Sequence, residues 1–178
     1  MTLQVSNTMT TEYRLLRTVL GTLRVVSDAG ATTSVEWVDE LDRAEPAPDA
    51  KLNPRLAPDL CARLVRASRG EEVDFSDVPT PPGPDFHRRC WEACRAIPRG
   101  QTRTYGQLAT MAGSTTGAAR SAGQAMRTNR VPIIVPCHRV TASTGLGGFA
   151  GCTDPTSPAM RRKTALLRAE GALTAARR

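Results

Sequence analysis

Three side chains that could act together in catalysis follow one another at the end of an apolar run. Residues 131–140 read VPIIVPCHRV, so a thiol, an imidazole and a guanidinium stand at Cys137, His138 and Arg139. The apolar residues favour burial, whereas the polar groups favour a functional surface. Because each proline in the run lacks a backbone donor, we predict a constrained extended segment that presents Cys137 to a site. A cysteine that only packs in an apolar loop is the alternative.

A cysteine needs a base to become a useful nucleophile at neutral pH, since its ordinary pKa is near 8.5. His138 is the neighbouring base. Successive side chains of an extended segment point to opposite faces, so we expect a water to link Cys137 and His138. A catalytic histidine also needs an acceptor that fixes its tautomer. Acidic residues are scarce after position 89, where the chain has only Glu92, Asp154 and Glu170.

Glu170 is the acceptor that the sequence favours. Lys163, Leu166, Leu167 and Glu170 share one stripe of a predicted helix. The two leucines would turn this stripe toward the core and draw the lysine and the carboxylate inward. A solvated face with a surface salt bridge is the alternative, and the leucines argue against it.

Charge is distributed unevenly along the 178 residues, whose net charge is +7. Residues 1–89 contain 11 Lys and Arg against 14 Asp and Glu, a net of −3, and residues 90–178 contain 13 against 3, a net of +10. A basic second half favours a polyanionic partner, and nucleic acid is the leading candidate.

The chain lacks the sequence features of membrane and exported proteins. No apolar stretch approaches the roughly 20 residues that span a bilayer, and the N-terminus lacks the pattern of a signal peptide. The five cysteines are odd in number and irregularly spaced, which favours reduced thiols over a disulfide framework. We therefore expect a cytoplasmic, nucleoid-associated protein with no membrane partner.

The first half begins with a predicted β-hairpin. Residues 15–26 and 34–38 are rich in apolar and β-branched residues and flank a glycine-containing turn at 28–31. The proline-rich stretch 43–55 is predicted to be a loop or linker.

One helix and a connector follow. The helix is predicted over 60–68 and ends near Gly70. The stretch 79–84 is rich in proline and is predicted to be an extended connector between two domains, which span residues 1–78 and 85–178. No catalytic constellation occurs before the connector.

The second half is predicted to begin with a helix that Asp85 caps and that runs to Ala96. His87, Cys90 and Cys94 share one face of this helix, which could indicate a metal site or core packing. A structural zinc site usually has four ligands, and no matching pair is evident. Core packing of the cysteines is favoured, and no metal is expected.

Two short helices separated by a glycine-containing turn are predicted over 104–113 and 115–127. This is the pattern of a helix-turn-helix, whose second helix can enter a DNA groove, although packed helical proteins also contain it. Arg120 and Arg127 lie seven residues apart, on one face of the second helix. The small residues around them would let the backbone approach DNA closely while the arginines supply charge.

Taken together, these motifs resemble the O6-alkylguanine-DNA alkyltransferases, also called methylated-DNA–protein-cysteine methyltransferases. The resemblance covers most of residues 80–178 and is weaker over 21–37. Besides Asn129, it rests on six motifs in the family's order: FHRRCW at 86–91, IPRG at 97–100, TYGQLA at 104–109, AAR at 118–120, PCHRV at 136–140 and LLRAEG at 166–171.

The resemblance implies an α/β (α+β) fold, in which an RNase H-like N-terminal domain precedes a helical, winged-helix-like C-terminal domain with a helix-turn-helix. It also implies a suicide enzyme of DNA repair. The Cys137 thiolate would take the alkyl group from O6-alkylguanine in double-stranded DNA after base flipping, and would keep it. No cofactor or metal is implied, and we expect a monomer. O4-alkylthymine remains open as a further substrate.

The family's functional residues fall on matching positions of this sequence. Those implied in catalysis are Cys137, His138, Glu170, Asn129, Tyr105 and Lys163. Those implied in DNA binding are Arg120, Tyr105, Ala119, Gly123 and Arg127. Those implied in the alkylguanine pocket are Met126, Val140, Phe149 and Ala150. Glu170, His138 and a water would activate Cys137, Asn129 would brace its turn, and Arg120 would fill the place of the flipped base. Tyr105 and Lys163 would assist the departing guanine.

Residues 152–159 depart from the family pattern as an additional loop rich in proline, serine and threonine. We expect this loop beside the pocket, where it would affect the range of alkyl groups accepted. Two other functions are the alternatives. A non-catalytic alkyltransferase-like DNA-binding protein would lack the acceptor that Cys137 provides. A cysteine hydrolase using Cys137 and His138 would leave the helix-turn-helix and the charge asymmetry unexplained.

Overall fold

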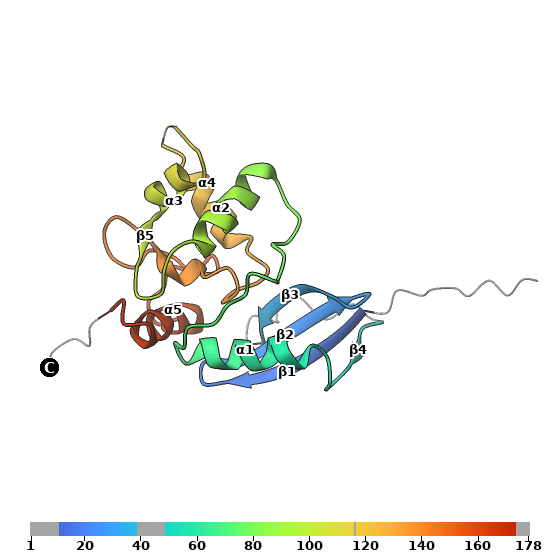
Figure 1. Cartoon of the computed structure of the whole chain (residues 1–178). Coiled ribbons are helices and arrows are strands. Elements are labelled where there is room, and N and C mark those ends of the chain that lie inside the picture. The colour runs from blue at the N-terminus through green and yellow to red at the C-terminus, as the bar shows by residue number, and fades with distance from the viewer. Residues whose placement is uncertain (1–10, 39–48, 116, 174–178) are drawn as a thin grey trace, which may run out of the picture.

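The computed structural model describes residues 11–38, 49–115 and 117–173 (Figure 1). The first half forms a sheet and one helix: β1 (Thr11–Thr18), β2 (Gly21–Asp28), β3 (Ala31–Trp37), β4 (Lys51–Leu52) and α1 (Pro58–Ser68). The first three strands are antiparallel neighbours. The short β4 pairs in parallel with β1, so the sheet order is β3-β2-β1-β4.

The β-hairpin expected around residues 28–31 is present as β2 and β3. The prediction that residues 15–26 form one arm of it is wrong, because the chain reverses at the end of β1 and pairs residues 11–18 with 21–28. Gly21 has a positive φ of 124° at this reversal, and the Thr18 hydroxyl donates to its carbonyl at 2.7 Å. Of the predicted loop over 43–55, only residues 49–55 lie within the described chain, and they include β4.

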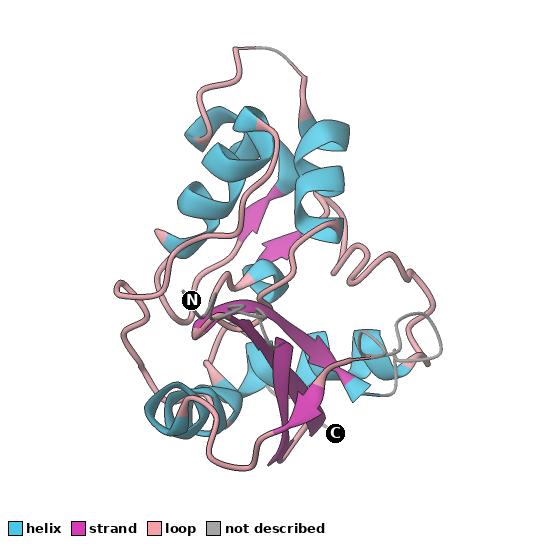
Figure 2. Cartoon of the chain, turned by 90° about the vertical axis from the view of Figure 1, so that its right-hand side faces the viewer, coloured by secondary structure: helices cyan, strands magenta, loops and turns pink. Residues whose placement is uncertain are grey.

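The second half is mainly helical. Its elements are α2 (Asp85–Arg95), β5 (Arg103–Thr104), α3 (Tyr105–Met111), α4 (Ala119–Arg127), the 3-10 turn η2 (Cys137–Arg139), β6 (Val140–Thr141) and α5 (Pro158–Ala169). Helices α2, α3 and α4 gather at one end of the molecule, and the sheet lies toward the other (Figure 2). The helix-turn-helix predicted from the sequence is present as α3 and α4, and Thr104 begins α3 with a capping box to Gln107.

Asp85 does not cap α2, contrary to the sequence prediction. Pro84 occupies the cap position and makes no side-chain cap, so Asp85 is the first helical residue. Its carboxylate pairs with Arg88 at 2.5 Å. An acidic side chain at this position still stabilises the helix, because the first turn of a helix carries partial positive charge.

The two halves pack against each other through α5 and the segment before Cys137. The Arg162 guanidinium stacks over the Trp37 ring at 4.6 Å, and the Val35 N–H donates to the Arg130 carbonyl at 2.7 Å. The buried residues of the sheet, α1 and the helical half form one contiguous hydrophobic cluster. The sheet therefore supports the segment that leads to Cys137.

Gly70, two residues after the end of α1, lies against Ala169 at the end of α5. Its φ is +81°, and a Cβ at this position would lie 2.4 Å from the Ala169 carbonyl oxygen. Arg99 joins the same ends, because its side chain donates to the carbonyls of Gly70 and Ala169. Since Glu170 directly follows Ala169, this contact helps to fix the start of the C-terminal turn.

We expect Gly70→Ala to destabilise the protein by about 2 kcal/mol or more, because it combines a strained left-handed residue with overpacking. Gly113→Ala is the matched control. Gly113 has the same φ of +81° but nothing within 4 Å of an added Cβ, so it should show only the backbone cost. Urea unfolding of both variants measures the difference, and equal losses would contradict the packing explanation.

Candidate active site

Cys137 stands at the start of a tight turn rather than at the end of an extended segment, which corrects the sequence prediction. Ile133 has a left-handed φ of 75°, and the Val135 N–H donates to the Val131 carbonyl at 2.9 Å, so the chain loops before it reaches η2. Burial of the apolar run is confirmed, since its valines and isoleucines all lie in the core. Hydrogen bonds within the loop, which apolar periodicity does not reveal, decided its shape.

Asn129 fastens this loop and contacts the thiol. Its Nδ2 donates to the Cys137 Sγ at 3.2 Å and to the Val135 carbonyl at 3.0 Å, while its Oδ1 accepts from the Val131 N–H at 3.0 Å. A donor at this distance favours the thiolate over the thiol. The amide therefore both orients the sulfur and stabilises the charge that a nucleophile must carry.

Cys137 lies at the wall of a small pocket and is 8% exposed. The pocket has a volume of about 150 Å³ and brings together α3, α4 and the turn after β6. Its lining residues are Tyr105, Gly123, Met126, Arg127, Cys137, Gly148, Phe149, Ala150, Gly151 and Thr153. The walls are mostly apolar or made of glycine backbone, so a flat ring could approach the sulfur closely.

His138 and Glu170 form a buried pair behind the thiol. The His138 Nε2 lies 2.9 Å from Glu170 Oε1, and both side chains are almost fully buried. Burial lowers the pKa of His138, although the Glu170 carboxylate acts in the opposite direction. The imidazole is therefore neutral, Nε2 carries the proton that Glu170 accepts, and Nδ1 has no hydrogen-bond partner among the described residues. Nδ1 is thus the ring atom that can accept a proton.

Arg139 clamps the same carboxylate. Its Nε and Nη2 donate to Glu170 Oε2 and Oε1 at 2.9 and 2.8 Å, and its Nη1 donates to the Ile97 carbonyl at 2.7 Å. Burial alone would raise the pKa of Glu170, but the hydrogen bonds from His138 and Arg139 outweigh it and bring the pKa to about 2. Glu170 therefore remains ionised at every physiological pH.

This low pKa predicts how stability depends on pH. The unfolded value for glutamate is near 4.3, so the stabilisation by ionised Glu170 is fully present above that pH and is lost as the pH falls toward 2. We expect the free energy of unfolding to decline over this range, and Glu170→Gln to flatten the decline. Urea unfolding at several pH values tests this, and an unchanged slope in the variant would contradict it.

Lys163 and Tyr105 converge on the backbone of the pocket wall. Lys163 is fully buried, and its Nζ donates to the carbonyls of Val140, Leu146 and Gly148 at 2.6, 2.7 and 2.9 Å. The Tyr105 hydroxyl donates to the same Gly148 carbonyl at 3.0 Å. Burial lowers the pKa of Lys163 to about 8, and burial together with Cys137 raises the pKa of Tyr105.

The structure separates some residues that the sequence grouped. Val140 was expected in the alkylguanine pocket, but it is fully buried and does not line the small pocket. Its carbonyl accepts a hydrogen bond from Lys163. Lys163 likewise lies behind the wall. Met126, Phe149 and Ala150 do line the pocket.

Helix α4 connects the pocket to an exposed surface. Arg120 and Arg127 are exposed, and Ala119 is half-buried near the helix start. Gly123 and Arg127 also line the pocket, so one helix carries both the basic surface and part of the wall. Arg127 lies against the Gly151 backbone, because a Cβ there would be 3.2 Å from its Nε.

Two contributors were missed in the sequence. The sequence assigns Arg139 no role, because Glu170 and Ile97, the residues it contacts, lie far from it in the chain. Thr153 of the additional loop lines the pocket, whereas the sequence indicated only that the loop lies nearby. Cys90 and Cys94 are buried in the core, and the His87 ring lies 3.2 Å from the Thr128 hydroxyl. Within the described ranges no group of three or more His, Cys, Asp or Glu residues could hold a metal ion.

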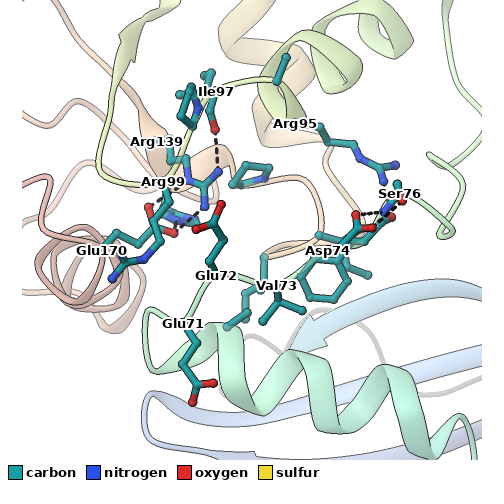
Figure 3. Close-up of a pocket in the computed structure, with 18 of the residues that line it drawn as sticks. Glu71, Glu72, Val73, Asp74, Ser76, Arg95, Ile97, Arg99, Arg139 and Glu170 are labelled. Carbon is teal, nitrogen blue, oxygen red and sulfur yellow. Dashed lines mark hydrogen bonds and ion pairs between the residues drawn. The ribbon is translucent and has the colours of Figure 1, made fainter.

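A second, larger cavity of about 480 Å³ lies on the other side of the His138–Glu170 pair. Figure 3 shows it between the chain that follows α1 and the segment after α2, with Arg139 and Glu170 at one end. The thiol does not line it. The small pocket is therefore the candidate reaction site, and the larger one, which we call the rear cavity, borders the residues that support it.

The chain is similar to known proteins of one family. Residues 85–172 match the family model described as 6-O-methylguanine DNA methyltransferase, DNA binding domain. The chain is 35% identical over 145 residues to the methylated-DNA–protein-cysteine methyltransferase of Mycolicibacterium paratuberculosis, covering 80% of this chain and 86% of that protein. It is 33% identical to the constitutive enzyme of Bacillus subtilis, covering 78% and 86%.

Solved structures show the same fold. The crystal structure of Mycobacterium tuberculosis O6-methylguanine methyltransferase superposes with a TM-score of 0.74 at 31% identity, covering 94% of this chain and 96% of that one. The structure of the M. tuberculosis protein OGT in complex with DNA gives the same TM-score and identity over 90% and 92%. The chain belongs to the methylated-DNA–protein-cysteine methyltransferase family and has its mixed α/β fold. No helix in the described segments has the length and apolar character needed to cross a membrane.

Proposed function

We propose that the protein repairs double-stranded DNA by direct reversal, moving the alkyl group of O6-alkylguanine to Cys137 in a single, irreversible turnover. The observation that carries this proposal is the Cys137 sulfur at the wall of the small pocket, with the Asn129 amide 3.2 Å away and the His138–Glu170 pair behind it. A nucleophile, an orienting donor and a buried base pair are the parts that alkyl transfer requires.

In this reaction the Cys137 thiol gives its proton through a water to His138 Nδ1. The thiolate then attacks the alkyl carbon, the new S–C bond forms, and the C–O6 bond breaks with its electron pair on guanine. Tyr105 lines the pocket and would supply the departing guanine with a proton, while Lys163 holds the Gly148 carbonyl and assists from behind. The thioether stays on the protein, so each molecule reacts once.

The target base must leave the duplex to reach the sulfur, because the thiol is buried at a pocket of about 150 Å³. We propose that α4 enters a DNA groove, that its small residues Ala119 and Gly123 allow close approach, and that Arg120 fills the place of the flipped base. Arg127 would contact DNA beside the pocket. In this account residues 85–178 bind DNA and react, and residues 1–78 form a supporting, RNase H-like domain.

The proposal is tested with a duplex that contains one O6-methylguanine. Guanine should be restored in an amount equal to the protein added, with no further turnover. Binding without loss of the lesion would favour a non-catalytic damage-recognition protein. Repeated turnover would favour a true catalyst, such as a cysteine hydrolase.

We expect Arg120→Ala to weaken duplex binding by about tenfold and to slow transfer to DNA, because it removes both a phosphate-neutralising charge and the group that fills the vacated stack. Arg168→Ala is the matched control, since Arg168 is exposed on α5, away from α4 (Figure 1). Fluorescence anisotropy with a labelled duplex measures both. Equal effects of the two substitutions would indicate a general charge effect and would contradict the role of Arg120.

A further inference from the structure

Arg139 is the only cation that directly contacts the Glu170 carboxylate among the described residues. Two parallel N–H donors meet its two oxygens at 2.9 and 2.8 Å, which is the paired geometry in which arginine binds carboxylates most strongly. The third contact, from Nη1 to the Ile97 carbonyl at 2.7 Å, ties the guanidinium to the end of α2. The carboxylate cannot rotate without breaking this clamp.

Glu170 in turn determines the state of His138. Its Oε1 accepts from both His138 Nε2 and Arg139 Nη2, so one oxygen is shared between imidazole and guanidinium. An acceptor fixed at Nε2 keeps the proton on that nitrogen and leaves Nδ1 as the basic atom. The guanidinium also cancels much of the carboxylate charge, which would otherwise favour a protonated, inactive imidazolium.

We propose that Arg139 is a positioning residue of this reaction, one that holds the Glu170 carboxylate beneath His138 and offsets its charge, so that the imidazole remains a neutral base. The proposal rests on the proposed function for its kinetic consequence, but its effect on His138 can be measured without any DNA. Arg139 does not line the pocket that contains Cys137 and acts only through Glu170 and His138.

The charged groups that act on His138 directly are Glu170, Lys163 and Arg139. The other charged residues that line the rear cavity are Glu71, Glu72, Asp74, Glu92, Arg95 and Arg99. Figure 3 shows Glu72 directed toward the end of the cavity where Arg139 and Glu170 lie, but the ion pair of Arg139 is with Glu170 and not with Glu72. Arg99 is already bound to the carbonyls of Gly70 and Ala169. The clamp on Glu170 therefore comes from Arg139.

The chain has only two histidines, His87 and His138, so nitrogen NMR can follow both rings separately. In Arg139→Gln we expect the pKa of His138 to rise by about one unit, because the full carboxylate charge then acts on the ring. The His87 ring, which lies beside the Thr128 hydroxyl and outside the clamp, supplies the reference signals in the same spectra. Arg139→Lys keeps the charge without the paired contact, so the pKa should stay closer to the parent value while the Nε2–H tautomer becomes less well defined.

Transfer to Cys137 provides the second readout. We expect about a tenfold or larger loss of rate in Arg139→Gln and a severalfold loss in Arg139→Lys, because a supporting partner of the relay has been removed. Glu72→Gln is the control, since it alters a charge on the same cavity without touching the clamp, and it should transfer at the parent rate.

Chemical rescue separates positioning from folding. Arg139→Ala should recover part of its transfer rate in millimolar guanidinium chloride, which can reach Glu170 through the rear cavity, but not in sodium chloride of equal concentration. Glu170→Gln should show no rescue. The proposal is wrong if Arg139→Gln leaves both the His138 titration and the transfer rate unchanged, or if guanidinium and sodium act alike on Arg139→Ala. A parent protein that transfers nothing would instead overturn the proposed function, and the titration would still test Arg139.

Discussion

Cys137→Ser should show no detectable alkyl transfer while binding a duplex about as tightly as the parent protein. A serine hydroxyl is far less acidic than a thiol, so neither the Asn129 amide nor the His138–Glu170 pair can make it a comparable nucleophile. The substitution is small and leaves α4 untouched. Transfer is measured by loss of O6-methylguanine from the duplex, and binding by anisotropy with the same duplex.

Cys152→Ser is the matched control for this experiment. Cys152 is a half-buried free thiol that lies next to two residues of the pocket wall, Gly151 and Thr153. It is bonded through its backbone to Phe149, at 2.8 and 2.9 Å, and these bonds do not depend on the sulfur. Cys152→Ser should therefore transfer at the parent rate. Transfer by Cys137→Ser, or its loss in Cys152→Ser, would place the acceptor elsewhere.

Glu170→Gln should slow transfer by about a thousandfold or more. A neutral amide cannot stabilise the imidazolium that forms when His138 accepts the thiol proton, and its N–H group can favour the wrong tautomer. The substitution also leaves the Arg139 guanidinium without its carboxylate. Single-turnover kinetics at saturating protein would show the loss as a slower chemical step with binding retained.

The control for Glu170→Gln is Glu92→Gln. Glu92 lines the same rear cavity, but its carboxylate accepts from the Thr80 hydroxyl and has no link to His138. It should transfer like the parent protein. If both variants lost transfer equally, a general effect of cavity charge would replace the relay as the explanation. Circular dichroism would confirm that each variant is folded at the assay temperature.

The local chemistry of the site could be predicted from sequence because its main groups are neighbours. Cys137 and His138 are adjacent, and the stripe that carries Lys163 and Glu170 has the helical spacing that buries one face. The roles of Asn129, Tyr105 and Arg120 came from the family resemblance, and they remain proposals until the variants are measured.

What could not be predicted depends on contacts between distant residues. Arg139 meets Glu170 across 31 positions of the chain and Ile97 across 42, so its adjacent sequence does not reveal the clamp. The loop before Cys137 turns at Ile133, whose left-handed backbone is rare for a β-branched residue and follows from the hydrogen bonds around Asn129.

In the fold, too, local patterns were predictable and contacts between distant residues were not. The hairpin of β2 and β3 and the two helices of the helix-turn-helix follow from local patterns and were predicted, whereas the short strands β4, β5 and β6 were not. The boundary between β1 and β2 was missed, because the apolar character of residues 15–26 continues through the reversal at Gly21. The close contact of Gly70 with Ala169 is likewise set by how α1 and α5 pack, which no local pattern encodes.

Peptide mass spectrometry shows whether Cys137 is the permanent acceptor of the alkyl group. The protein is incubated with an excess of duplex that carries O6-methylguanine with a deuterated methyl group, and then digested. We expect one labelled methyl group per protein molecule, found only on the peptide that contains Cys137 and stable to prolonged incubation. Label on the peptide of another cysteine, or restored guanine with no label on the protein, would contradict it.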